Sequence, residues 1–156
     1  GRMGIFPGAD ELMEVLMTMF KAVGLNVKLR IPEHSAWRPF DNKPFPTNQG
    51  PYLLLKMHNN SFGDAVFTII YNYHCQGVNS PMCDKQVDSL IDKARVITGE
   101  ERRKLWQTAF KRIHEEIVPN VQLFHMVSYA RVGKRINFKP SLATVGELQI
   151  AQITFR

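Results

Sequence analysis

The sequence predicts an α/β fold in which helices pack on a mixed sheet, and two adjoining patterns carry that prediction. Residues 10–23 repeat apolar side chains at the period of a helix, whereas residues 25–31 alternate apolar and polar side chains. Gly24 separates the two patterns. A helix, a glycine and a strand in direct succession are typical of a layer in which the helix folds back onto a sheet.

The first helix is expected from Asp10 to Val23. Asp10 is a candidate N-cap after the Pro7-Gly8 turn, and Gly24 suits the end of a helix. The apolar stripe, which Met13 and Met17 widen, consists of Leu12, Val15, Leu16, Met19, Phe20 and Val23. A methionine-rich face can be an adaptable binding surface, but we interpret this stripe as buried core.

Two strands are expected in the next part of the chain. The first covers residues 25–31 and ends at Pro32, and the second covers residues 52–57. Between them lie five prolines and little periodicity, so we expect a loop with one helical turn near residues 35–38. The polar segment 58–64 follows the second strand directly, at the position where α/β sheets usually bind ligands.

Three further helices are expected. Asp64 is a candidate cap for a short helix ending at Tyr73, and Asp84 is a candidate cap for a second apolar stripe. That stripe consists of Val87, Leu90, Ile91, Ala94 and Ile97. Thr98 and Glu101 match a capping box for a third helix.

The third helix is expected to run to about Val118, since Pro119 cannot continue it. Its predicted buried face consists of Leu105, Trp106, Ala109, Phe110, Ile113 and Ile117. Short strands are expected beyond it, at residues 121–124, 127–132, 136–138 and 148–155. The sequence contains no internal repeat or low-complexity tract.

Composition restricts the class of protein. The 156 residues, of which 44% are hydrophobic, suffice for one core and are too few for two comfortable domains. This composition excludes a disordered chain, a collagen-like repeat and a small disulfide-dense scaffold. Apolar runs are far shorter than 18 residues, so no membrane-spanning helix is predicted.

The chain is basic, with 20 Lys and Arg against 14 Asp and Glu and a net charge of +6. A basic chain is typical of proteins that bind nucleic acid. The charges are scattered, however, and the densest runs are only 102–104 and 134–135. We therefore predict a solvated surface and no nucleic-acid partner, with a basic nucleic-acid-binding domain as the alternative function.

The first residues, Gly1-Arg2-Met3-Gly4, contain no initiator methionine and no export signal. Two explanations follow: an export signal was removed, or the chain is a piece of a longer protein. We favour the second, because the first recognisable element is a helix with no strand before it.

The two cysteines, Cys75 and Cys83, are separated by seven residues rich in turn formers. Such a loop can bring two Cα atoms within disulfide range, and closing it would add about 2.5 kcal/mol of stability. The bond would indicate an oxidising compartment; two free buried thiols are the alternative. Although His74 adjoins Cys75, the spacing differs from that of structural zinc sites, so no metal is predicted.

The sequence contains no catalytic constellation. His114-Glu115-Glu116 resembles the start of a zinc-protease helix, but position 118 is a valine. Nucleophile-elbow, P-loop and dinucleotide-binding motifs are also missing from the sequence. We therefore expect a protein that is not an enzyme, with no catalytic residue and no cofactor.

Several segments together resemble one family. They are Gly1-Arg2, residues 20–29, residues 61–65, residues 79–94 and residues 100–105. In their order and spacing they resemble the C-terminal part of extracytoplasmic solute-binding proteins of the peptide/nickel class of ABC importers. This class includes the dipeptide- and oligopeptide-binding proteins, and the resemblance extends over nearly the whole chain.

The resemblance implies one lobe of a periplasmic-binding-protein-like, type II clamp fold. Residues 1–139 would form most of the C-terminal lobe, and residues 140–156 would return toward an N-terminal lobe encoded upstream. The two lobes of such proteins close over a solute, and the closed form docks on the ABC permease in the membrane. The implied location is the periplasm or another extracytoplasmic compartment, and the implied activity is transport without catalysis.

The resemblance also implies which residues contact ligand. Dipeptide-binding relatives carry Trp-x-Gly-Asp-x-Gly-Asp-Pro here, and its first aspartate binds the ligand's α-ammonium. Aligned on Gly63-Asp64, that aspartate corresponds to Ser61 and the tryptophan to His58. A charge-assisted contact of about 1.5–3 kcal/mol is therefore missing, which disfavours a free dipeptide N-terminus. A modified peptide, a glutathione-like compound or another small solute fits better.

Two residues outside this segment complete the implied site. Arg2 lies near an arginine that meets the ligand carboxylate in relatives, and Trp37 lies near a family tryptophan. Relatives also carry a cysteine pair flanking the loop of Cys75 and Cys83, which supports the disulfide. The predicted ligand-binding set is Arg2, Trp37, His58, Asn59, Asn60, Ser61, Phe62 and Asp64.

Overall fold

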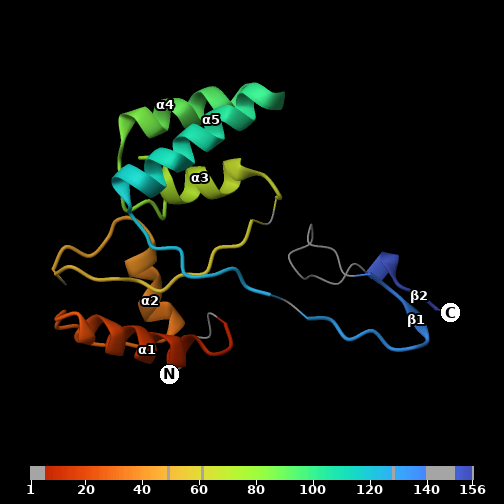
Figure 1. Cartoon of the computed structure of the whole chain (residues 1–156), viewed down its shortest axis with the longest axis horizontal. Coiled ribbons are helices and arrows are strands. Elements are labelled where there is room, and N and C mark those ends of the chain that lie inside the picture. Colours follow the sequence, from red (N-terminus) through yellow and green to blue (C-terminus); the bar gives the residue numbers. More distant parts are fainter. Residues whose placement is uncertain (1–5, 49, 61, 128, 140–149, 156) are drawn as a thin grey trace. The chain divides into compact units, whose positions relative to one another are not determined.

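The computed structural model describes residues 6–48, 50–60, 62–127, 129–139 and 150–155, with the His34 side chain left out. Their secondary structure is mixed and mostly helical, with a small antiparallel sheet of β1 (Ile136–Asn137) and β2 (Thr154–Phe155) (Figure 1). This composition is compatible with the α/β class. The chain divides into two compact units, unit 1 (residues 1–58) and unit 2 (residues 59–156), and each is described by itself.

Unit 1 begins with α1 (Ala9–Ala22), within one residue of its predicted bounds. Its N-cap is Gly8 with φ 84°, so the prediction that Asp10 caps the helix was wrong. Gly8 adopts the left-handed backbone that the turn requires, and this starts the helix earlier. Ala9 and Met13 are buried, whereas Val15, Met19 and Val23 of the predicted core stripe are 55–75% exposed.

The two predicted strands of unit 1 are not formed. All residues of 25–31 and 52–57 are described, and none of them lies in a strand. The alternation of residues 27–31 persists in their burial, because Val27, Leu29 and Ile31 are half-buried while Lys28 and Arg30 are exposed. A period of two determines which face a strand buries, but a strand also needs a partner for its backbone hydrogen bonds.

The helix α2 (His34–Asp41) is longer than the single turn expected, and Pro39 lies inside it. Contacts at its C-terminal end join it to the segment 52–56. The Phe40 and Tyr52 rings meet edge to face at 5.2 Å, the Tyr52 hydroxyl donates to the Phe40 carbonyl at 3.1 Å, and Lys56 Nζ lies 2.7 Å from Asp41 Oδ1. These contacts stabilise the last turn of a helix whose proline removes a backbone donor.

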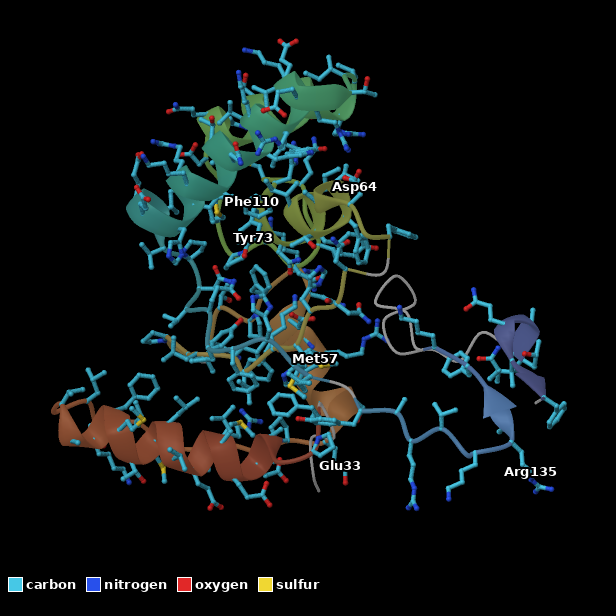
Figure 2. The ribbon with its side chains drawn as sticks, turned by 45° about the vertical axis from the view of Figure 1, so that its right-hand side comes forward. Glu33, Met57, Asp64, Tyr73, Phe110 and Arg135 are labelled. Atoms are coloured by element: carbon cyan, nitrogen blue, oxygen red, sulfur yellow. A yellow bond between two sulfur atoms is a disulfide. The ribbon has the colours of Figure 1, made fainter. Side chains whose placement is uncertain are left out.

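Unit 2 contains α3 (Ala65–Tyr73), α4 (Lys85–Arg95) and α5 (Gly99–Arg112), which lie side by side in Figure 1. Their shared core consists of Ile69, Tyr73, Val87, Ile91, Ala94, Trp106, Ala109 and Ile113. Figure 2 labels Tyr73 and Phe110, which lie close together. Their ring centroids are 6.3 Å apart with nearly perpendicular planes, and Phe110 packs against the cluster. The stripes predicted for α4 and α5 therefore do form core.

The helix caps of unit 2 agree with two of three predictions. The side chains of Asp64 and Asp84 accept the backbone N–H groups of Val66 at 2.8 Å and Val87 at 2.9 Å. Thr98 is the N-cap of α5 but makes no side-chain cap bond, so the predicted capping box was wrong. Gly99 enters the helix with φ 72°, a left-handed geometry that differs from the one a capping box needs.

The end of the α5 helix agrees with the prediction to about one residue. After Arg112 the chain makes a π-helical turn, η1 (Ile113–Ile117), and Val118 follows with φ 50°. The residue before a proline is disfavoured in the right-handed helical region, and Pro119 follows Val118. This β-branched residue instead takes a left-handed conformation, and its N–H donates to the Ile113 carbonyl at 2.8 Å.

Beyond Pro119, only the predicted strands at 136–138 and 148–155 correspond to observed strands. β1 and β2 pair Ile136 with Phe155 and Asn137 with Thr154, and η3 (Ile150–Gln152) precedes β2. The strands predicted at 121–124 and 127–132 are wrong for the described residues, whose apolar side chains, such as Val121 and Tyr129, are exposed. Most of the predicted tail, 140–149, lies outside the described residues.

Within the part of the chain that the structure describes, the helices are not packed on a larger mixed sheet as predicted. They pack on one another instead, since α4 contacts both α3 and α5. No described helix is both long and apolar enough to span a bilayer.

Candidate functional site

A tight turn leads into α3 in the predicted ligand-binding segment. The Asn60 carbonyl accepts the Gly63 N–H at 3.0 Å, and Gly63 has a left-handed φ of 64°. Phe62 lies on this turn and is 74% exposed, with its ring edge-on to Phe67 at 4.8 Å. The turn therefore displays an aromatic side chain to solvent beside the exposed amides of Asn59 and Asn60.

Asp64, at the start of α3 in Figure 2, faces α5. Besides its cap bond, its carboxylate accepts both Arg102 guanidinium nitrogens, Nη1 at 2.7 Å and Nη2 at 2.8 Å. The hydrogen bonds from Arg102, and then that from Val66, hold the pKa of Asp64 below its ordinary value. The charge of Asp64 is therefore already balanced by a guanidinium.

Arg102 is itself fixed by two more contacts. Its Nε donates to the Ala94 carbonyl at the end of α4 at 3.1 Å, and its Cζ lies 5.3 Å from the centre of the Trp106 ring. One side chain thus joins the start of α3, the end of α4 and the core of α5. A second arginine of α5 makes a similar contact, since Arg112 donates to both oxygens of the α4 cap Asp84 at 3.2 and 2.8 Å.

The pKa of the cap carboxyl group is lowered more by Arg112 than by Arg102. Hydrogen bonds from Arg112, and then from Val87, lower the pKa of Asp84 to about 2. We call the two contacts, Asp64 with Arg102 and Asp84 with Arg112, the cap–arginine pairs. Each joins the N-terminus of one helix to the side of another, so each is a tertiary contact as well as a cap.

An open cavity of about 300 Å³ adjoins the first pair. It is lined by Gly63, Asp64, Thr98, Gly99, Arg103 and Trp106, together with Arg102. Arg103 is paired with Glu100 on the same helix. The lining offers hydrogen-bond donors and an aromatic wall, which suits binding of a polar solute; it contains no nucleophile with an adjacent base.

The remaining predicted ligand residues lie in unit 1 or outside the described part. Trp37 is half-buried in α2, and His58 is partly exposed at the end of unit 1. Desolvation, and then the charge of Lys56, lower the pKa of His58. Arg2 and Ser61 lie outside the described residues. The structure therefore brings Asn59, Asn60, Phe62 and Asp64 together at the start of α3.

The predicted disulfide is present. Cys75 and Cys83 have their sulfur atoms 2.06 Å apart and their Cα atoms 4.3 Å apart. Asp88 lies beside it, 8% exposed, and accepts the Cys75 N–H at 2.9 Å. A second open cavity, of about 630 Å³, lies on this side of unit 2 and is lined by His74, Lys85, Asp88, Ser89, Asp92 and Lys93.

Sequence reasoning missed Arg102, Arg112 and Asp88. A charged residue that lies among the apolar residues of a helical stripe could have revealed Asp88 and Arg102. Asp88 lies three residues before Ile91, and Arg102 lies four residues before Trp106. A charged residue on a buried face needs a partner, because burying an unpaired charge is costly.

No family model matches the chain, and neither the curated proteins nor the solved structures contain a significant match. The likeness to solute-binding proteins therefore depends on the sequence motifs alone.

Proposed function

We propose that the chain is the C-terminal lobe of a solute-binding protein of an ABC importer, which captures a peptide-like solute and delivers it to a membrane permease. The observation that carries the proposal is the turn before α3. It displays Phe62, 74% exposed, beside two exposed asparagines, in the segment where the sequence motifs place the ligand contacts.

The exposed extended segments also support a second lobe. Residues 27–31 keep an alternating burial although the structure forms no strand there, and Val121, Leu123 and Val127 are 46–78% exposed on another extended segment. Strand-forming residues that expose apolar side chains are suited to pair with strands supplied from elsewhere. A clamp protein, in which the chain crosses between lobes, would supply them.

The disulfide supports an exported protein, because such bonds persist in oxidising compartments. The basic residues of α5 argue against the nucleic-acid alternative. Arg102, Arg103 and Arg112 all pair with carboxylates of unit 2. A paired guanidinium is less available to a phosphate, so the arginines of α5 are poor contacts for a nucleic acid.

The contacts of Asp64 refine the ligand. Because Arg102 already balances its charge, Asp64 is a poor anchor for a ligand ammonium group. Asn59 and Asn60 carry amides, which donate and accept hydrogen bonds without a formal charge. We therefore propose a solute whose recognised part is an amide-bearing chain with a blocked or absent α-ammonium, in contact with the Phe62 ring.

The test is native mass spectrometry of the protein purified from the cells that produce it. We expect a bound small molecule that contains amide bonds and is released on unfolding. In calorimetric titration with the released compound, Phe62→Ala should weaken binding at least tenfold. Tyr129→Ala, which removes an aromatic side chain that is 93% exposed, is the matched control and should have no effect. Equal affinities of the two variants would contradict the proposal.

A further inference from the structure

The surroundings of the disulfide include a third metal-ligating group that the spacing of the cysteines does not reveal. The sulfur atoms of Cys75 and Cys83 and a carboxylate oxygen of Asp88 all lie within 4.8 Å of one another. Asp88 comes from the first turns of α4, whereas the cysteines flank the preceding loop. Cys83 is exposed, whereas Asp88 is buried and lines the open cavity beside the cluster.

Asp88 is held in place without using the sulfur atoms. It accepts the Cys75 N–H at 2.9 Å, and Lys85 Nζ lies 3.8 Å from its other oxygen. His74 Nε2 lies 3.7 Å from the Asp88 carboxylate, while its Nδ1 accepts the Gln76 N–H at 3.1 Å. Because its Nδ1 accepts a hydrogen bond and its Nε2 faces the Asp88 carboxylate, His74 supports Asp88 and is not counted among the ligands.

The loop between the cysteines is also fixed independently of their bond. Gly77 donates to the His74 carbonyl at 2.8 Å, and Asn79 donates to the Tyr71 carbonyl at 3.1 Å. A Cβ atom on Gly77 would lie 2.3 Å from the Ile70 carbonyl oxygen, so the loop lies tightly against the end of α3. These contacts do not involve the sulfur atoms, and they keep both cysteines close to Asp88 when the disulfide is opened.

We propose that reduction of the disulfide converts this cluster into a binding site for one Zn²⁺, with Cys75, Cys83 and Asp88 as ligands. This inference goes beyond the proposed transport function. A small dithiol gives two electrons and two protons to the S–S bond and becomes a disulfide itself, leaving two protein thiols. Zn²⁺ then displaces a proton from each thiol as two Zn–S bonds form.

The geometry suits this ion. Zinc binds thiolate sulfur at about 2.3 Å and carboxylate oxygen at about 2.0–2.2 Å, in a tetrahedron. Opening of the S–S bond lets the two sulfur atoms separate to the nearly 4 Å that a tetrahedral site needs, while the Asp88 oxygen, within 4.8 Å of both, approaches by about 1 Å. A water molecule would complete the coordination, since Cys83 is exposed. The bound metal thereby replaces the covalent bond as the link across the loop.

The test is Zn²⁺ titration of the chain after reduction with a phosphine, in competition with a coloured chelator. We expect the reduced chain to bind one Zn²⁺ and the oxidised chain to bind none. Co²⁺ in place of Zn²⁺ should give the intense near-ultraviolet band of thiolate coordination. Asp88→Asn should weaken binding at least tenfold, whereas Asp92→Asn should not. Asp92 is the matched control, because it lies 3.8 Å from His74 Nε2 on the same helix.

Circular dichroism shows whether the helices of the reduced chain persist without metal, and this decides which result the Zn²⁺ titration should give. If the helices persist without metal, one equivalent of Zn²⁺ must bind directly. If they are lost, Zn²⁺ must restore the helical signal, and Asp88→Asn must reduce that restoration. Absence of uptake at one equivalent, or equal loss of affinity in Asp88→Asn and Asp92→Asn, would overturn the proposal.

Discussion

The helical cluster of unit 2 and the helix α1 of unit 1 start from similar sequence patterns and reach different degrees of burial. Each has a continuous apolar stripe. In α4, the stripe residues Val87, Ile91 and Ala94 are completely buried, whereas Val15 and Met19 of α1 and its C-cap Val23 are at least 55% exposed. A helical period thus determines which face is apolar, but burial depends on whether another element covers that face.

The largest expected difference concerns the core. Ile91→Ala in α4 should lower the free energy of unfolding by about 3 kcal/mol, because Ile91 is completely buried and the truncation leaves a cavity. Val15→Ala in α1 should lower it by less than about 0.5 kcal/mol, since Val15 is 55% exposed. Urea unfolding followed by circular dichroism measures both. Similar losses would contradict the comparison.

The disulfide is the next largest contribution to unit 2. Replacing both cysteines by serine should lower the free energy of unfolding by about 2.5 kcal/mol, because the open loop has more freedom in the unfolded chain. Thermal unfolding of the variant and of the wild type, both without metal, gives the difference. An unchanged midpoint would contradict this contribution of the bond.

The cap–arginine pairs should contribute less, because both are partly open to solvent. Arg102→Met and Arg112→Met should each lower the urea midpoint, since each leaves a helix-cap carboxylate without its guanidinium. Arg103→Met is the matched control on the same helix and should lower the midpoint less, because its pair with Glu100 is exposed. Chemical unfolding ranks the three variants, and equal costs would show that the pairs are merely surface contacts.

The same pairs predict a pH dependence of stability. Folding lowers the pKa of both Asp64 and Asp84, that of Asp84 from 3.8 to about 2. A carboxyl group whose pKa is depressed contributes stability above its unfolded pKa, and this contribution is lost as the pH falls through the folded value. We therefore expect stability to decline between about pH 4 and pH 2. The decline should be shallower in the Arg102→Met/Arg112→Met double variant, and equal slopes in urea titrations would refute this.

Sequence reasoning predicted the helices and caps that depend only on residues close together in the chain. The spacing of apolar residues placed α1, α4 and α5 within a few residues, and the cap Asp64 placed α3. Asp64 and Asp84 were identified as caps because a cap needs only its own first turn. The turn chemistry between Cys75 and Cys83 likewise predicted their disulfide.

The features that sequence reasoning missed depend on residues far apart in the chain. Asp64 and Arg102 are 38 residues apart, and Asp84 and Arg112 are 28 apart. The strands expected at 25–31 and 52–57 failed for the same reason, since a ladder requires a partner that an alternating pattern does not specify. Phe62 is exposed because of the turn on which it lies, and its residue type alone does not predict that exposure.

Hydrogen exchange measured residue by residue tests the central contrast most directly. The account predicts that the backbone amides of α4 and α5 exchange most slowly, at the rate of global unfolding. The amides of residues 28–31 and of the described part of 121–132 should exchange much faster than those of α4, because these residues lie in no strand. Protection of those two segments equal to that of α4 would contradict the account, since it would require sheet partners within this chain.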